Sequence, residues 1–362
     1  MKEPNWHRLG PAQQFAGKPL QQLQIGELKI ALSYRDGEFG AISGVCNHVG
    51  GPLGEGMLSK DGYAVCPWHS WQFHRLTGEA RPGTPAAVPR HDVKVEKGDL
   101  FINLTPATKR INAPHAAHPL SREIRREPGP LRVVGISTTA MNQTFPRYST
   151  SEDLLQVSLD HAKSEGAETK LVRLNTLPFK NCEGYYSKNA RACTWPCTIT
   201  QFDETDQLSM VYEALVFWAD VVLVATSIRW GAPSSLYFKM IERMNCIQNQ
   251  ITTHDRVMIL NKVAGFVITG GQDNIQAVAG QMMMFFGELG FSFPQFPFIA
   301  HSRGWSAEDM ENNMTHVKSD QDLRNGAKAL TDRCLKMAAG LVASGECTAA
   351  IERGGRKAHM QK

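Results

Sequence analysis

Short runs that alternate apolar and polar residues fill the first hundred positions of the chain. The clearest are LKIALSYR at 28–35, GEFGAISGV at 37–45 and GDLFINL at 98–104, with glycine turns between such runs. A period of two turns one row of side chains toward a core and the other toward solvent. The pattern therefore predicts an antiparallel, all-β domain over residues 1–104.

The pattern changes after position 130, where apolar runs of strand length alternate with helical periods. The runs are LRVVGIS (131–137), ETKLVRLN (168–175), DVVLVATS (220–227) and VAGFVITG (263–270), and a long amphipathic stretch closes the region at 322–342. Strands buried on both faces and joined through helices are typical of an α/β fold. We expect a doubly wound, mostly parallel sheet over residues 131–345.

The remaining segments carry no sustained apolar period. Residues 105–130, TPATKRINAPHAAHPLSREIRREPGP, are rich in Pro, Ala and Arg and are predicted to be a linker. Residues 346–362 are predicted to be a basic, polar tail. The chain is thus interpreted as two domains with a linker and a tail.

Composition limits the classes of function. A chain of 362 residues has room for two cores, and a net charge of +4 is too small to indicate nucleic-acid binding. The N-terminus has no apolar secretory core, and the apolar stretch Val211–Ile228 contains Glu213 and Asp220, so we expect no membrane span. Eight cysteines without a secretory signal favour the reducing cytoplasm and metal or redox roles for thiols.

Two cysteine–histidine pairs carry the strongest chemical signal. They are Cys46-Asn-His48 and Cys66-Pro-Trp-His69, with seventeen residues between them. Two thiolates and two imidazoles suit a [2Fe–2S] cluster in which sulfur holds one iron and nitrogen the other. A structural zinc site uses the same residue types, but it usually groups the cysteines in one knuckle and the histidines on one helix. Mixed pairs therefore favour the iron–sulfur cluster.

The residues around these pairs, CNHVGG and CPWHSWQFHRLTGE, resemble the Rieske ferredoxins and the Rieske domains of ring-hydroxylating oxygenases. The resemblance implies an all-β Rieske fold with Cys46, His48, Cys66 and His69 as ligands. Respiratory Rieske proteins add a disulfide between the loops and a serine that bonds a bridging sulfur. Gly50, Trp68 and Trp71 stand at those positions here, so fewer hydrogen bonds stabilise the reduced cluster and a low potential is expected.

Ligands of an open α/β sheet bind beyond the carboxyl ends of its strands, and three such ends have suggestive sequences. The first ends at Ser137, and the loop after it leads to Arg147, Ser149, Thr150 and Ser151 at the start of a predicted helix. Hydroxyls and N–H groups at a helix N-terminus can bind phosphate. The alternative is an ordinary N-cap by Ser151, with an acidic residue in the first turn.

The second and third strand ends extend this site. The segments are TSIRWGAPSS (226–235) followed by LYFKMIERM, and TGGQ (269–272). With the first end, they resemble the flavodoxin-like NAD(P)H-dependent FMN reductases and iron–sulfur flavoproteins, over about 131–342. The resemblance implies FMN, NAD(P)H as the hydride donor, and an aromatic residue, Trp230, beside the flavin ring. The implied cofactor residues at these two ends are Thr226, Ser227, Ile228, Arg229, Trp230, Gly231, Thr269, Gly270 and Gly271.

The chain departs from this family in a phosphate loop longer than the common S-P-R-x-x-S form and at two residues of the second strand end. Ser227 replaces the usual proline and Arg229 the usual tyrosine. Arg229 could stabilise a reduced flavin or hold an acidic substrate, or it could simply form a surface ion pair. His301, which follows the last predicted strand, is a candidate proton donor. The catalytic residues are otherwise unknown from the sequence.

Three cysteines, Cys182, Cys193 and Cys197, lie in a predicted insertion between the second and third strands. Iron–sulfur flavoproteins carry four close cysteines in this region for a [4Fe–4S] cluster, and Cys246 could supply the fourth ligand. The alternative, which we favour on spacing, is that these are buried or loop thiols without a metal.

These features predict a flavin-dependent oxidoreductase that passes electrons between FMN and the Rieske cluster. We expect NAD(P)H as donor, a small organic acceptor, and a homodimer or homotetramer. No G-x-G-x-x-G fingerprint occurs, so the nucleotide would bind at the flavin itself. The alternatives are an electron-transfer component that serves a separate oxygenase, and a redox sensor. The sequence does not indicate the substrate, the preferred nucleotide or the direction of electron flow. It also does not indicate whether electrons pass within or between subunits.

Overall fold

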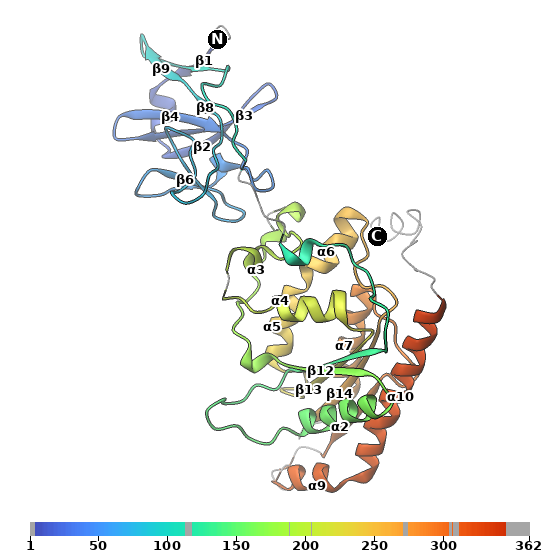
Figure 1. The fold of residues 1–362 in the computed structure, drawn as a ribbon. Coiled ribbons are helices and arrows are strands. Elements are labelled where there is room, and N and C mark those ends of the chain that lie inside the picture. Colours follow the sequence, from blue (N-terminus) through green and yellow to red (C-terminus); the bar gives the residue numbers. More distant parts are fainter. Residues whose placement is uncertain are drawn as a thin grey trace. The chain divides into compact units, whose positions relative to one another are not determined.

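The computed structural model describes residues 4–112, 118–187, 189–203, 205–270, 274–303, 306 and 311–344. The chain divides into two compact units (Figure 1). The first contains Met1–Ala117 and also the distant segment Gly184–Ala192, and the second contains His118–Glu183 and Cys193–Lys362. Residues from the second half of the sequence therefore complete the first unit.

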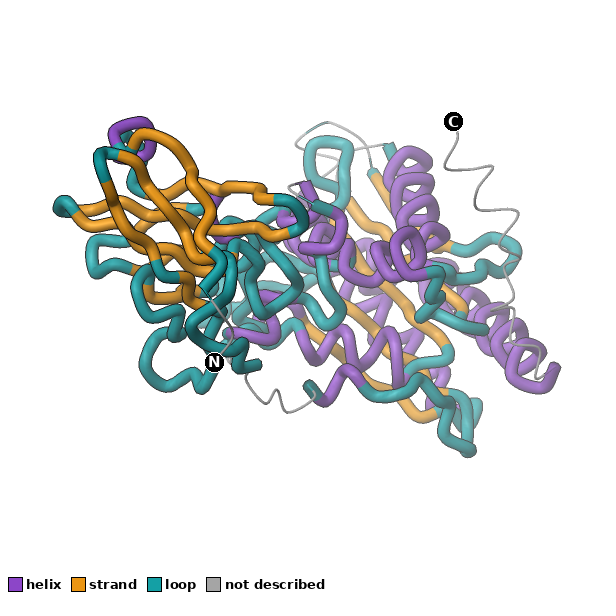
Figure 2. Tube along the Cα trace, turned by 90° about the horizontal axis from the view of Figure 1, so that it is seen from above, coloured by secondary structure: helices purple, strands orange, loops and turns teal. Residues whose placement is uncertain are grey.

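The first unit consists mainly of strands and loops (Figure 2). Its elements are β1 (Trp6–Pro11), α1 (Gln13–Ala16), β2 (Leu20–Ile25), β3 (Leu28–Arg35), β4 (Glu38–Ser43), β5 (Met57–Leu58), β6 (Tyr63–Val65), β7 (Gln72–His74), β8 (Arg90–His91), β9 (Val93–Glu96) and β10 (Asp99–Asn103). They form antiparallel sheets in the orders β1-β10-β9, β2-β3-β4-β8 and β5-β6-β7. The predicted all-β fold is confirmed.

The alternation seen in the sequence separates two small cores in this unit. Ile30 and Leu32 of β3 pack with Leu100 and Ile102 of β10 in one core. Ala31, between them in sequence, faces the other core, which contains the two cluster cysteines. The strand alternation thus builds the floor beneath the predicted cluster.

The second unit contains a five-stranded parallel sheet in the order β12-β11-β13-β14-β15. The elements are β11 (Arg132–Ser137), α2 (Thr150–Ser164), β12 (Glu168–Arg173), α3 (Thr198–Phe202), α4 (Ser209–Tyr212), β13 (Val221–Ser227), α5 (Ser235–Arg243), α6 (Asn245–His254), β14 (Val263–Gly270), α7 (Ile275–Leu289), β15 (Phe298–Ser302), α9 (Asn313–Ser319) and α10 (Gln321–Ser344). A π-helical turn, Glu213–Trp218, follows α4.

Helices cover both faces of this sheet. Val133 and Leu223 pack with α2 and α10 on one face, whereas their strand neighbours Val134 and Val224 pack with α5 and α7 on the other. Strands buried on both sides explain the unbroken apolar runs. The flavodoxin-like α/β fold is confirmed, and its strand order places the switch point between β11 and β13, where this fold binds ligands.

The predicted linker, 105–130, contacts folded parts of the chain at both of its ends. Arg110 donates a hydrogen bond to Val45 O at 3.0 Å, and Leu120 is buried in the second unit's core, so both ends of 105–130 pack against folded parts.

In the described part of the chain, no helix combines the length and apolarity needed to cross a bilayer. The predicted tail, 346–362, lies outside the described residues.

Candidate redox centres

The two cysteine–histidine loops share one backbone design. Gly50 N donates to Cys46 O at 3.2 Å, and Ser70 N donates to Cys66 O at 3.0 Å, four residues apart in each case. Each cysteine N–H also donates to the carbonyl five residues on, at 2.9 and 2.7 Å. Gly50 and Ser70 both have positive φ, +81° and +58°. Two matching turns thus present one cysteine and one histidine each.

The two predicted histidine ligands lie next to each other, and so do the two predicted cysteine ligands. Nδ1 of His48 lies 2.9 Å from Nδ1 of His69, and their ring centroids are 4.5 Å apart. The Cys46 and Cys66 thiols are buried and hydrogen-bonded to each other, which together with burial raises the pKa of Cys46. One nitrogen pair and one sulfur pair suit a cluster that takes two ligands of each kind on separate irons.

The residues around this site are closely packed. A Cβ on Gly51 would lie 2.7 Å from Sγ of Cys66 and 3.1 Å from the Trp68 ring, so glycine is required there. The Trp71 ring stacks on His48 with centroids 5.3 Å apart and planes 6° apart. The residues present therefore fit a Rieske cluster.

Arg110 is a neighbour of this site that sequence analysis missed. It hydrogen-bonds the side chain of Asn47, within the first loop, and its charge opposes the rise in the pKa of Cys46. Asn47 also donates to Ala87 O and Ile111 O at 3.1 and 2.8 Å, which ties the loop to two other segments. Since Arg110 lies in the predicted linker, nothing in its local sequence indicates this role.

Hydroxyl groups gather at the N-terminus of α2. Ser149 Oγ accepts from Glu152 N at 3.3 Å and lies 2.8 Å from Thr139 Oγ1, which is itself 3.2 Å from Ser151 Oγ. Ser149, and not Ser151 as the alternative interpretation had it, is therefore the N-cap. The first N–H groups of a helix lack intrahelical partners, so this end offers hydroxyl and amide donors to an anion.

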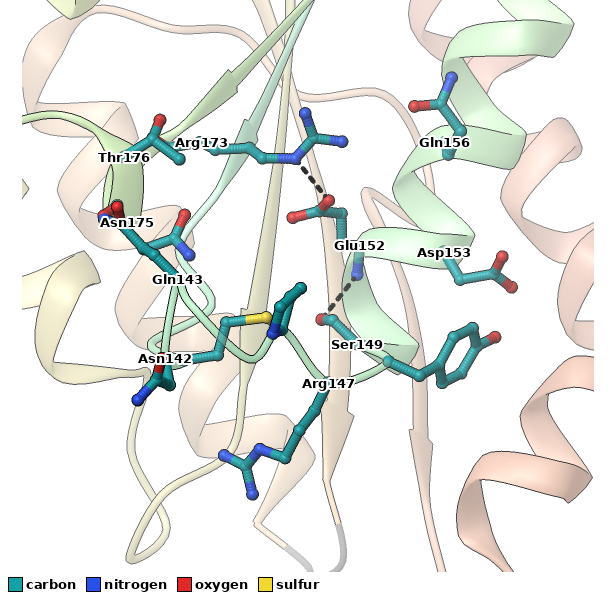
Figure 3. A pocket seen from close by; sticks show the side chains of 13 residues that line it. Asn142, Gln143, Arg147, Ser149, Glu152, Asp153, Gln156, Arg173, Asn175 and Thr176 are labelled. Atoms are coloured by element: carbon teal, nitrogen blue, oxygen red, sulfur yellow. Dashed lines mark hydrogen bonds and ion pairs between the residues drawn. The ribbon is translucent and has the colours of Figure 1, made fainter.

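The side chains of Ser137 and Arg147 lie in different surroundings near the N-terminus of α2. Ser137 Oγ donates to Glu152 at 2.6 Å, and Arg173 Nε donates to the other carboxylate oxygen at 2.6 Å. The Arg147 side chain extends away from this ion pair (Figure 3). Ser137 thus serves to orient Glu152, whereas Arg147 is exposed and available to a ligand.

A pocket of about 460 Å³ opens beside these groups, within the usual size range of small-molecule sites. Residues of the β11–α2 loop, of α2 and of the segment after β12 line it. Among the predicted cofactor residues it includes Arg147 and Ser149. The carboxylate-bearing residues Glu152 and Asp153 also line this pocket, and the predicted cofactor residues of the β13 and β14 ends that the structure describes are not among its lining residues.

The β13 end is organised through Ser234, the N-cap of α5. Ser234 N donates to Thr226 Oγ1 at 3.1 Å, and its hydroxyl donates to Thr138 O at 2.6 Å. The loop between them places Trp230 at φ +51° with 96% of its surface exposed, followed by Gly231 at φ +71°. An exposed indole on a rigid turn can stack on a flat ring.

The β14 end joins the other two. Thr269 O accepts from Ile228 N at 2.8 Å, and Thr269 Oγ1 lies 2.7 Å from Thr150 Oγ1 on α2. A Cβ on Gly270 would lie 2.7 Å from Cβ of Ile228, so the close approach of the two strand ends needs glycine. The predicted residue Gly271 lies outside the described residues.

The candidate catalytic residues occupy different surroundings. His301 lies within β15, opposite Thr269 in register, and not after the strand. Its Nε2 is 3.0 Å from Oδ1 of Asn313 and its ring stacks on His316, while burial lowers its pKa. Arg229 is exposed, and its backbone closes the turn with Ala232. Their catalytic roles stay predictions.

The four cysteines considered for a second cluster gather within the second unit. Burial raises the pKa of Cys193 to about 11, and nearby Cys197 and Cys182 add to the rise. Cys246 is buried and hydrogen-bonded to Cys197. None of the four forms a disulfide in the described structure. Among the described residues, no three or more His, Cys, Asp or Glu side chains are placed to hold a single metal ion.

A buried cation accompanies these thiols. Arg243 is fully buried and pairs with Asp206 at 2.8 Å, and its Nε has no hydrogen-bond partner in the described structure. The hydrogen bond from Cys246 and the Arg243 charge lower the pKa of Cys197 to about 6. This lowering favours the thiolate form of Cys197.

Comparison with known proteins identifies the first unit. Residues 5–97 match the family described as Rieske [2Fe-2S] domain. The ferredoxin component of the alkene monooxygenase system of Xanthobacter autotrophicus is 33% identical over 85 residues, which cover 24% of this chain and 70% of that protein.

The second unit matches a different family. Residues 132–305 match NADPH-dependent FMN reductase. The 8-demethyl-8-aminoriboflavin-5'-phosphate synthase of Streptomyces davaonensis is 25% identical over 171 residues, covering 45% of this chain and 60% of that protein. A crystal structure of RosB with a bound riboflavin-phosphate intermediate aligns over 64% of this chain and 88% of that one, at 19% identity and a TM-score of 0.49. This chain therefore belongs to the Rieske [2Fe–2S] family, and its residues 132–305 match the NADPH-dependent FMN reductase family.

Proposed function

We propose that this protein is a flavin-dependent oxidoreductase that passes electrons between FMN and its Rieske cluster, with NAD(P)H as hydride donor and a small organic molecule as acceptor. The observation that carries the proposal is the presence of both family domains in one chain. A flavin exchanges two electrons with a nicotinamide, whereas a [2Fe–2S] cluster exchanges one. A chain with both is suited to convert between the two.

The chain's own residues support both halves of this proposal. Cys46, Cys66, His48 and His69 would hold the cluster, and their paired arrangement supplies the required donors. The α2 N-terminus, with the Ser149 and Thr150 hydroxyls, would hold the FMN phosphate.

The turn after β13 would flank the flavin ring. Its residues are Thr226, Ser227, Ile228, Arg229, Trp230 and Gly231. Trp230 presents an exposed indole, and the backbone of the turn is fixed by the hydrogen bond between Ile228 and Thr269. Arg229 is exposed on the same turn and would attract an acidic acceptor or a nucleotide phosphate. His301 would act as the proton donor from the adjacent strand end.

A second candidate function is delivery of single electrons to a separate oxygenase. The 33% identity with the ferredoxin component of an alkene monooxygenase system favours it. The two candidates differ in whether the small molecule or a protein is the final acceptor.

Anaerobic stopped-flow mixing with NADH or NADPH tests the proposal. We expect the flavin absorbance to bleach first and the cluster to become reduced afterwards. In Cys66→Ser the second phase should disappear, because one sulfur ligand is lost. Failure of both nucleotides to reduce the flavin would overturn the NAD(P)H route.

We also propose a cytoplasmic homodimer or homotetramer. No disulfide links the described cysteines, which supports a reducing compartment. Sedimentation analysis of the purified protein tests the assembly, and a monomer at all concentrations would contradict it.

A further inference from the structure

The segment Gly184–Ala192 departs from the order of the sequence. It lies between β12 and α3, both elements of the FMN reductase domain, yet it packs as part of the Rieske unit. Its described residues, 184–187 and 189–192, include two single-turn helices, Tyr185–Ser187 and Ala190–Ala192. We call this segment the cap.

The cap contacts one of the cluster ligands directly. The carbonyl oxygen of Ala192 lies 2.5 Å from Nε2 of His69, and Ala192 is fully buried. The ring of Tyr185 stands edge-on to the same imidazole, with centroids 4.9 Å apart at 80°. His69 is only 7% exposed.

This hydrogen bond fixes the state of the imidazole. A carbonyl can only accept, so Nε2 of His69 carries the proton and Nδ1 keeps its lone pair. Nδ1 is the atom that faces His48. The cap therefore holds His69 in the tautomer and orientation that a metal ligand needs, as outer-sphere partners of ligating histidines do.

The cap also covers the route from the cluster to the surface through His69. Cys46 and Cys66 are 3% and 2% exposed, so the sulfur side is closed, whereas His48 is partly exposed. A separate redox protein that approached His69 would meet Tyr185 and the backbone of the cap instead. The cap continues without a break into Cys193 of the FMN reductase domain.

We propose that the cap is a built-in partner surface of the Rieske cluster, supplied by the FMN reductase domain, which positions His69 and excludes separate redox proteins from it. Tyr185 and Ala192 are positioning residues in this proposal. It rests on the proposed function, because it makes the chain's own flavin domain, and not another protein, the partner of the cluster.

Two substitutions in the full-length protein test this, with Tyr186→Leu as the matched control because Tyr186 is the exposed neighbour in the cap. Tyr185→Leu removes the ring contact, and Ala192→Leu crowds a fully buried position and displaces the carbonyl. Pulsed EPR of the reduced cluster reads the remote histidine nitrogen, and a redox titration gives the midpoint potential. We expect a changed nitrogen coupling and a higher potential in both variants, because a weaker acceptor makes the imidazole a poorer donor to the oxidised cluster.

Access to the cluster is measured with oxidised cytochrome c, which takes one electron from the reduced cluster into its ferric haem. Freeze-quench EPR should show faster cluster oxidation in the two variants than in the parent protein and in Tyr186→Leu. Ferricyanide, a small one-electron oxidant, should react at nearly the same rate throughout.

Unchanged nitrogen coupling, potential and cytochrome reactivity in both variants would overturn the proposal. These readouts need no nicotinamide, so they are separate from the proposed function. Cap variants that behave as expected, in a protein whose flavin never reduces the cluster, would leave the cap proposal supported and the proposed function contradicted.

Discussion

Single residues decide whether the cluster site can form, and Gly51 shows this most directly. The space that a side chain would need is taken by Sγ of Cys66, 2.7 Å from the position of a Cβ, and by the Trp68 ring. Neither neighbour can move without displacing a ligand or the loop behind it. Glycine is required at this position by contact and not by backbone torsion.

We predict that Gly51→Ala lowers the iron content of the purified protein and destabilises the first unit by about 1–3 kcal/mol, as overpacking does. Iron analysis and chemical unfolding measure the two effects. Gly17→Ala is the control, since a Cβ there meets nothing within 4 Å. Full iron content in Gly51→Ala would show that the loop relaxes to accept the methyl group.

Cys197 offers a second prediction at this scale. Its pKa is lowered to about 6 by the hydrogen bond from Cys246 and by Arg243, so the thiolate is populated above pH 6. Alkylation by iodoacetamide should therefore rise through pH 6 and level off by neutral pH. Cys334, whose pKa burial raises to about 12, should remain unreactive. A rate that rises only above pH 8, or no labelling at any pH, would contradict a free thiolate.

The lowered pKa of Cys197 also determines how the free energy of unfolding depends on pH. A thiol whose pKa is lower in the folded state favours folding when it is ionised. Its contribution is full above the ordinary thiol pKa and falls as the pH drops toward 6. The free energy of unfolding should lose this contribution in Cys197→Ser.

At the scale of elements, the start of α2 combines a structural and a binding role. Ser149 caps the helix, and its hydroxyl lies among those of Thr139 and Ser151. The cap stabilises the helix whether or not a ligand is bound, whereas the hydroxyl cluster matters for an anion. Two substitutions separate these roles.

Ser149→Ala should cost about 1 kcal/mol of unfolding free energy and weaken FMN binding. Ser149→Asp keeps a good N-cap but adds a negative charge where the phosphate would lie. We expect it to restore stability and to weaken FMN binding further, measured by flavin fluorescence. Equal FMN affinity in both variants and in the parent protein would place the phosphate elsewhere.

Elements were also what the sequence predicted best. The alternating run at 28–35 and the apolar run at 263–270 became β3 and β14 with the same bounds, because each pattern matches one burial environment. Ser149 was missed as the N-cap because three neighbouring hydroxyl residues are equivalent in sequence. Arg110 and the cap were not predicted, since each acts on a loop far away in the chain, and no local period encodes such contacts.

At the scale of the whole molecule, the cap proposal predicts that the cluster and the flavin of one chain work together. A mixture of two inactive variants tests this in an oligomer. Cys66→Ser lacks the cluster and Ser149→Asp binds FMN weakly, so each mixed assembly holds the two cofactors on different chains. We expect no NADPH-dependent reduction of the cluster. Recovery of that reduction on mixing would show transfer between chains.

The most direct test of the central claim is an anaerobic NADPH titration followed by visible absorption and EPR. FMN takes two electrons and the cluster takes one, so full reduction should need about 1.5 equivalents of NADPH per chain and end with a Rieske EPR signal. An endpoint at about one equivalent, with a bleached flavin and a cluster that stays oxidised, would contradict electron transfer between the two centres.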